Sequence, residues 1–166
     1  MRPALKEAKK RLSGKKNLIV AEIGVLRGEN AREILRDWSE VETLYLIDNY
    51  CCGWSEFETA KKIIYPWVNR CVWKLGDSVE QIEDIEDNLL DCVYIDGDHS
   101  YEGVKRDILA SWAKLKTNGI LCGHDYQTRW ESLSGAVKAV DEFVAENNLK
   151  LWSETSGSSS DWVLTK

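Results

Sequence analysis

Polar side chains gather at five points of this chain, each directly after a short apolar run. In chain order they are Glu22, which the glycines Gly24 and Gly28 follow, then Asp48, then Asp77 and Ser78, then Asp96, Asp98 and His99, and last His124 and Asp125. Carboxylates accept hydrogen bonds from hydroxyl and amino groups, and imidazole exchanges protons near neutral pH. A single acid after a strand is more often a helix cap than a ligand. Five strand ends that agree favour one binding site with acid–base chemistry.

The apolar runs predict the strands that must position these side chains. Residues 18–21, 43–48, 70–75, 90–96 and 120–126 are short and rich in β-branched residues, as in strands buried on both faces. Segments with helical periodicity separate them. This alternation predicts an α/β fold with a parallel sheet, in which ligands bind at the carboxyl ends of the strands.

The remaining elements follow from periodicity and from helix and turn signals. We expect helices over 3–13, from Ala31 to Trp38, over 54–68 with Pro66 ending or bending the last turn, from about Ser100 through Leu115 with a cap at 117–119, and over 134–147. Lys150–Ser153 and Asp161–Thr165 flank a Gly/Ser stretch and predict an antiparallel hairpin. The chain is therefore expected to form one domain over 1–166, with an N-terminal helix within 1–16.

The first strand is followed by Glu22, Gly24 and Gly28, with the spacing E-x-G-x-x-x-G. Glycine suits a tight strand-to-helix turn because it takes positive φ cheaply and lets a ligand lie against the backbone. Glu22 would repel a pyrophosphate, and the spacing differs from the dinucleotide pattern G-x-G-x-x-G. A glycine turn without any ligand would leave the same pattern, so this motif alone does not decide.

Two further strand ends predict a nucleoside site. Asp48 lies where a carboxylate can accept both ribose hydroxyls, for NAD as readily as for S-adenosylmethionine (SAM). Asp77 and Ser78 could approach an adenine ring. For Ser78 the stronger interpretation is a helix N-cap, because Ser78 and Gln81 resemble a capping box.

His99 follows Asp96 by three residues and could act as a general base toward a substrate hydroxyl. The alternative is that His99 caps or packs on the helix that begins near Ser100. Trp54 and Trp130 are in predicted loops at the same edge and are candidates for lining a substrate pocket. Trp38, Trp67 and Trp112 are on apolar helix faces and are expected in the core.

Composition excludes several classes of partner. The chain has 166 residues, a formal net charge of −6 and a pI of about 5.1, so a nucleic-acid partner is not expected. Its five cysteines form no C-x-x-C pair and are expected to be free thiols in a reducing compartment. No apolar stretch suggests secretion or a membrane span. We expect a cytoplasmic protein.

Several segments resemble one enzyme family. E-x-G-x-x-x-G resembles the first motif of class I SAM-dependent methyltransferases, and DCVYIDGDHSYEGVKRDI, NGILCGHDY, AVDEF and SSDWV resemble the TylF/CmcI-like branch of small-molecule O-methyltransferases. The resemblance covers nearly the whole chain. It implies a Rossmann-like, doubly wound, seven-stranded sheet in the order 3-2-1-4-5-7-6, mostly parallel with a C-terminal antiparallel hairpin.

The resemblance also implies a reaction, in which SAM methylates a hydroxyl of a small molecule. A divalent ion such as Mg²⁺ or Mn²⁺ would assist, with Asp96, His124 and Asp125 as ligands. Asp96 would also be a catalytic residue and contact the cofactor. Many relatives have a second acid where this chain has the predicted ligand His124. A second copy of the chain is expected if the pocket needs a partner subunit. A non-catalytic SAM- or nucleotide-binding module and an NAD-binding enzyme remain the alternatives.

Overall fold

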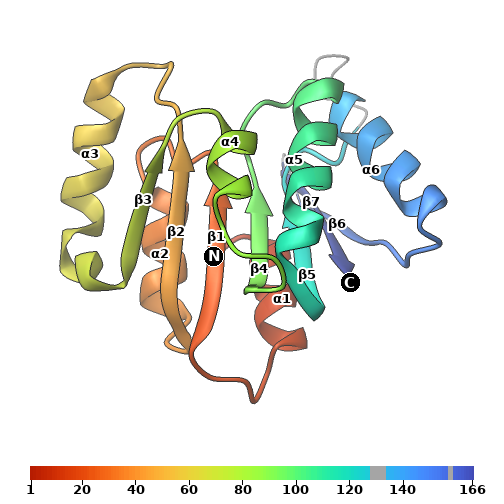
Figure 1. Cartoon of the computed structure of the whole chain (residues 1–166), viewed down its shortest axis with the longest axis horizontal. Helices are drawn as coiled ribbons and strands as arrows, with labels where there is room; N and C mark the ends of the chain where they lie inside the picture. The colour runs from red at the N-terminus through yellow and green to blue at the C-terminus, as the bar shows by residue number, and fades with distance from the viewer. Residues whose placement is uncertain (128–133, 157–158) are drawn as a thin grey trace.

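The computed structural model describes residues 1–127, 134–156 and 159–166. At its centre is a seven-stranded sheet in the order β3-β2-β1-β4-β5-β7-β6 (Figure 1). The strands are β1 (Leu18–Ile23), β2 (Val41–Asp48), β3 (Cys71–Leu75), β4 (Leu90–Ile95), β5 (Leu115–Gly123), β6 (Trp152–Ser156) and β7 (Ser159–Thr165). The first five are parallel, and β7 is antiparallel to both β5 and β6. The predicted fold class and strand order are confirmed.

Helices cover both faces of the sheet. One face carries α1 (Pro3–Arg11), α2 (Glu29–Asp37) and α3 (Trp54–Ile64), which continues into the 3-10 helix η1 (Tyr65–Arg70). The other face carries α4 (Ser78–Glu83), α5 (Tyr101–Lys114) and α6 (Ser134–Glu146). In Figure 1, α4 and α5 lie in front of the sheet and α6 lies beside α5. The first motif's strand β1 lies between β2 and β4, so the turn that follows it is at the centre of the carboxyl edge.

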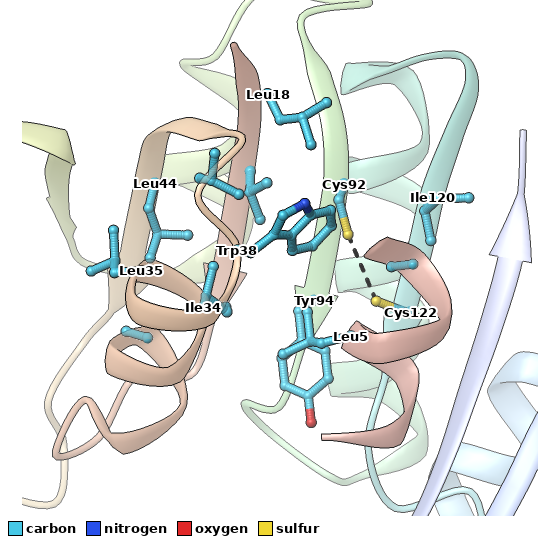
Figure 2. Packing of buried hydrophobic residues seen from close by; sticks show 14 of the residues in the cluster. Leu5, Leu18, Ile34, Leu35, Trp38, Leu44, Cys92, Tyr94, Ile120 and Cys122 are labelled. Carbon is cyan, nitrogen blue, oxygen red and sulfur yellow. Dashed lines mark hydrogen bonds between the residues drawn. The ribbon is translucent and has the colours of Figure 1, made fainter. Parts of the chain in front are cut away.

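Two apolar clusters fill the spaces between the sheet and its two helical layers. In the first, Trp38 and Leu5 pack against β1, β4 and β5 (Figure 2), and Trp38 is fully buried as predicted. Burial of each such large side chain contributes about 1.5–3 kcal/mol. Cys92 and Cys122 belong to the same cluster, with their sulfur atoms 3.8 Å apart as free thiols (Figure 2). All five cysteines are free, in agreement with the sequence.

The structure confirms one predicted helix end and contradicts another. Pro66 ends the regular helix as expected, since α3 stops at Ile64 and a 3-10 turn follows. The predicted cap at 117–119 is wrong, because α5 ends at Lys114 and these residues belong to β5. Asn118 does take a positive φ of 62°, but it does so in an irregular strand whose backbone pairs with Lys166. Tertiary pairing therefore replaces the helix cap.

None of the helices in the described ranges is long and apolar enough to cross a membrane.

At the carboxyl edge, β5 ends at Gly123, so His124 and Asp125 follow the strand, whereas Glu22 lies inside β1. The fold thus separates a buried acid in the sheet from the polar groups above it.

Candidate active site

A cavity of about 600 Å³ opens at the carboxyl ends of β1 to β4. Six of the predicted site residues line it, namely Gly24, Asp48, Asp77, Ser78, Asp96 and His99. Glu22, Gly28, His124 and Asp125 are not part of this lining. Its volume is in the range of small-molecule and cofactor sites. The topology therefore brings most of the predicted residues to one hollow.

Gly24 forms the floor of the turn after β1. Its φ of 86° confirms the predicted conformation. A Cβ built on Gly24 would lie 2.2 Å from the backbone oxygen of Asp96 and 2.7 Å from the nitrogen of Gly97. The space that a side chain would take is filled by the backbone after β4. Glycine is thus required here by a close approach within the protein, where the sequence suggested an approach to ligand.

Gly28 has a different task from Gly24. It is the N-cap of α2 with a φ of 79°, and a Cβ there would lie 2.9 Å from Cδ1 of Ile64 and 3.3 Å from Ala60. The second glycine of the motif therefore lets α2 and α3 pack closely. It shapes the site from outside the cavity.

Glu22 is buried below the turn, with 1% of its surface exposed. Asn30 donates a hydrogen bond from Nδ2 to Oε1 of Glu22 at 2.9 Å, while Oε2 has no partner among the described residues. Burial raises the pKa of Glu22 to about 8, with Asn30 opposing and the charges of Asp96 and Asp48 adding to the rise. Glu22 is therefore mostly protonated at neutral pH. The repulsion of a pyrophosphate that the sequence suggested does not apply to a neutral carboxyl group.

Asp48 ties two turns together. Its Oδ2 accepts hydrogen bonds from the backbone nitrogens of Val25 and Leu26, both at 2.8 Å, and its Oδ1 accepts one from Tyr50 at 2.6 Å. Leu26 and Tyr50 both have a φ of 49°, a conformation that needs such support. Oδ1 keeps acceptor capacity toward the cavity. Asp48 therefore holds the rim in shape and can also accept from a ribose hydroxyl.

The predicted cap at Ser78 is wrong by one residue. Asp77 is the N-cap of α4 and accepts from the backbone nitrogens of Val79 and Glu80 at 3.0 and 3.4 Å. The Ser78 hydroxyl instead donates to Oδ1 of Asp107 at 2.5 Å. Aspartate caps as well as serine does, so the local pattern did not distinguish them. Arg106 also pairs with Asp77, at 3.0 Å.

Asp107 also lines the cavity, although sequence reasoning missed it. It lies on α5, is 2% exposed, and burial raises its pKa to about 6 against the lowering effect of the Ser78 hydrogen bond. Val104 and Ile108 are buried on the same helix. An acid at a core-facing helix position was the available signal, because buried acids need a partner.

Asp96, His124 and Asp125 form a cluster at the ends of β4 and β5. Each can place one ligand atom within 4.8 Å of the others. Asp125 accepts from Nδ1 of His124 on one oxygen at 2.8 Å and pairs with Nδ1 of His99 on the other at 3.0 Å. The structure thus brings the predicted metal ligands together and joins His99 to them through Asp125.

The structure excludes His99 as the N-cap of α5. Ser100 is the N-cap of α5, since its hydroxyl accepts from the nitrogen of Gly103 at 3.1 Å. The His99 side chain is 41% exposed and lines the cavity. His99 is therefore not the helix cap, and its ring is held at the cavity by Asp125.

Charge in this cluster is balanced by burial and by neighbours. Burial raises the pKa of Asp96 to about 6, although His124 and Arg2 lower it. Burial would also raise the pKa of Asp125, but the hydrogen bond from His124 and the charges around it hold that pKa below its usual value. Asp125 is the firmly ionised acid of the cluster.

A known protein family matches most of this chain. A model of the family described as "Methyltransferase domain" matches residues 21–126, from β1 through the residues just after β5. The chain belongs to the methyltransferase-domain family. This membership confirms the family and the enzyme class, a transferase, that the sequence predicted. A search of curated proteins gave no match.

Solved structures share the fold of this methyltransferase domain at low identity. An O-methyltransferase from Bacillus cereus in complex with SAH is 17% identical with a TM-score of 0.73, covering 100% of this chain and 82% of that one. A putative caffeoyl-CoA O-methyltransferase from Staphylococcus aureus is 14% identical with a TM-score of 0.77, covering 100% and 84%. A precorrin 8w decarboxylase from Methanobacterium thermoautotrophicum is 14% identical with a TM-score of 0.69, covering 100% and 92%. At these identities the likeness shows the fold alone.

Two residues of this methyltransferase domain enter the site without any signal in the sequence. Arg2 donates from Nη1 to Nε2 of His124 at 2.7 Å, and Asp161 of β7 places Oδ1 3.8 Å from the same nitrogen. Both are far from His124 in the chain, so no local spacing connects them.

Of the two tryptophans proposed for the pocket, Trp54 is 67% exposed and outside the lining, and Trp130 lies outside the described residues.

Proposed function

We propose that this methyltransferase-domain protein transfers a methyl group from SAM to a hydroxyl oxygen of a small molecule. The observation that carries the proposal is that His99, which is paired with Asp125, lines the same cavity as the polar groups suited to a nucleoside. SAM would supply an electrophilic methyl group on its sulfonium. The SAH in the Bacillus cereus structure supports the choice of cofactor over NAD.

The cofactor would bind along β1 to β3. Asp48 would accept hydrogen bonds from the ribose hydroxyls, and Asp77, Ser78 and Asp107 would face the adenine ring. Gly24 and Asp96 would border the methionine portion, with Glu22 and Gly28 acting from below and behind the turn. The half-buried arrangement excludes water from one side of the ligand, which favours transfer over hydrolysis.

His99 would act as the general base. Its Nδ1 is engaged by Asp125, so Nε2 is left to take the proton from the acceptor hydroxyl. The oxygen then forms its bond to the methyl group as the carbon–sulfur bond breaks. The products are the methyl ether and S-adenosylhomocysteine, with the proton on His99. The acid–base pair thus completes an in-line transfer.

A divalent ion is the finer part of the proposal. Asp96, His124 and Asp125 offer two carboxylates and one imidazole, a donor set that suits Mn²⁺ and allows Mg²⁺. An ion held there would lower the pKa of a bound hydroxyl. We expect Mn²⁺ or Mg²⁺ to raise the melting temperature of the SAM-bound protein. Asp125→Asn should abolish that rise, and an unshifted wild type would remove the metal from the proposal.

Calorimetry with SAM, S-adenosylhomocysteine and NAD tests the cofactor. Binding of the first two and not of NAD supports the proposal, and the reverse would favour an NAD-binding enzyme. Transfer of labelled methyl from SAM to a panel of hydroxyl-bearing molecules then tests the reaction. Loss of transfer in His99→Asn with unchanged SAM affinity would support the base. SAM binding with no transfer to any acceptor would indicate a non-catalytic module.

The acceptor class and the setting are proposed on charge. A net charge of −6 disfavours nucleic acid, and we propose a small molecule in the cytoplasm. A second copy of the chain is proposed as a cover for the open side of the cavity. Size-exclusion chromatography with light scattering would test for it.

A further inference from the structure

Arg2 brings a fixed positive charge into the acceptor side of the site. Its Nη1 lies 2.7 Å from Nε2 of His124, and its Nη2 lies 3.9 Å from Oδ2 of Asp96. A guanidinium has no acceptor atom, so Nε2 must accept this hydrogen bond. The Nδ1 proton of His124 then points to Asp125 at 2.8 Å. Arg2 therefore fixes the tautomer of His124 as well as its position.

The segment that carries Arg2 is anchored to the same end of the sheet. The backbone nitrogen of Ala4 donates to Oδ2 of Asp161 at 2.9 Å, and Asp161 is fully buried in β7. The other oxygen of Asp161 has no hydrogen-bond partner in the described part of the chain. It lies 3.8 Å from Nε2 of His124, the atom to which Arg2 donates. A buried, unpartnered carboxylate oxygen thus faces the place where the cation sits.

Charge explains why a cation is needed here. Asp96, Asp125 and Asp161 are buried or nearly so and surround one imidazole. Acids this close repel each other unless a positive group lies among them. Arg2 supplies that charge from the N-terminal segment. A divalent ion among Asp96, His124 and Asp125 would meet the same need.

We propose that Arg2 is a resident cation of the acceptor site, and that it competes with a divalent ion for Asp96 and His124. The inference rests on the metal part of the proposed function. An ion that bound His124 through Nε2 would have to displace Arg2 from that atom. One that bound through Nδ1 would break the hydrogen bond to Asp125 and would still face the guanidinium near Asp96. The first mode requires Arg2 to leave His124, and in the second mode the positive charge of Arg2 opposes the ion.

Mn²⁺ alone is a suitable probe, because free Mn²⁺ is measured directly by electron paramagnetic resonance. The experiment compares wild type, Arg2→Gln and Arg2→Lys, each saturated with S-adenosylhomocysteine. Arg36→Gln is the matched control, since Arg36 is an exposed arginine that pairs with Asp37 on α2. A melting shift with S-adenosylhomocysteine equal to that of wild type shows that each variant is folded.

Arg2→Gln should bind Mn²⁺ at least about tenfold more tightly than wild type, because a like charge near the ion is removed. Arg2→Lys and Arg36→Gln should remain near the wild-type affinity. The double variant Arg2→Gln with Asp125→Asn should lose the gain, which assigns the ion to this cluster. Hydrogen exchange supplies a second readout. Saturation with Mn²⁺ should speed the exchange of residues 2–6 in wild type.

Two results would overturn the inference and are distinguishable. Equal Mn²⁺ affinity of wild type and Arg2→Gln would mean that arginine and ion do not compete, while the metal proposal stands. No Mn²⁺ binding by either protein, with S-adenosylhomocysteine binding intact, would remove both the competition and the metal. Failure to bind S-adenosylhomocysteine would instead count against the methyltransferase proposal itself.

Discussion

The two halves of the carboxyl edge hold their carboxylates in different ways. Over β1, β2 and β3 the partners are mainly backbone amides, three of which donate to Asp48 and two to Asp77, with Arg106 as a side-chain partner of Asp77. Over β4, β5 and β7 the partners are mainly side chains that carry or exchange charge, namely those of Arg2, His99 and His124. The half over β1, β2 and β3, here the cofactor half, is fixed by the fold. The charge of the half over β4, β5 and β7, here the acceptor half, depends on pH and on the cations present.

This difference separates what is preorganised from what is adjustable. Backbone amides do not titrate, and they are placed as soon as the turns form, so the cofactor half needs no ligand to take its shape. The acceptor half gathers several acids around two imidazoles and one guanidinium, so its charge state changes with its occupant. Substitutions in the first half should therefore act on stability and SAM binding together.

Gly24→Ala is expected to have the largest effect. The new Cβ would collide with the backbone of Asp96 and Gly97 in addition to the strain of positive φ, at a cost of about 3–5 kcal/mol in unfolding free energy. SAM binding should be lost with it. Gly14→Ala is the control, because Gly14 has a φ of 85° and open space around it. That variant should cost only about 1 kcal/mol. Equal costs in urea denaturation would show that φ alone matters.

Asp48→Asn comes next. The amide that replaces one carboxylate oxygen would face backbone N–H donors, so the free energy of unfolding should fall by about 3 kcal/mol. Because amides do not titrate, the loss should be the same at pH 6 and pH 8. SAM affinity should fall as well, through the loosened rim. Asp37→Asn, at an exposed ion pair, should leave both quantities nearly unchanged. A strong pH dependence of the Asp48→Asn effect would contradict the comparison.

The strand pattern of the sequence explains why most of the carboxylates at this edge could be predicted. Each acid follows an apolar run, so the edge on which Asp48, Asp77 and Asp96 meet follows from local periodicity. The residue that caps α4 could not be predicted in this way, because Asp77 and Ser78 are both good N-caps. Only the hydrogen bond from Ser78 to the buried Asp107 on α5 decides between them. The fold was predictable where the signal is local.

The acceptor half shows where sequence reasoning ends. His124 and Asp125 were expected at the strand end, and they are there. Arg2 is 122 residues from His124, directly before a helix whose spacing indicates only an apolar face. Contacts of this kind arise because α1 packs beside β5 and β7, which no short motif records.

Glu22→Gln tests the buried acid beneath the two halves and should stabilise the protein. The ordinary pKa of Glu22 is 4.5, and burial raises it to about 8 in the fold. Its contribution to stability is therefore complete below pH 4.5 and is lost as pH rises through 8. Glutamine stays neutral, so the variant should lie within about 1 kcal/mol of wild type near pH 5, exceed it by about 2 kcal/mol at pH 6 and by about 4 kcal/mol at pH 8. Glu86→Gln, at an exposed position, is the control. A difference that does not grow with pH would show that Glu22 is ionised in the fold.

Asp125→Asn should have the smallest effect on stability, and it gives the direct contrast with Asp48→Asn. Asp125 loses two partners that are side chains, and one of them, His99, is 41% exposed and free to turn to water. We expect a loss of about 1 kcal/mol at pH 7. The pKa of Asp125 lies below its usual 3.8, so this contribution is present above pH 3.8 and disappears as pH falls through the folded pKa. Wild type and variant should therefore converge in acid. Equal losses for the two variants at pH 7 would mean that histidine partners hold a carboxylate as firmly as backbone amides do, and the division of the edge into a fixed and an adjustable half would not stand.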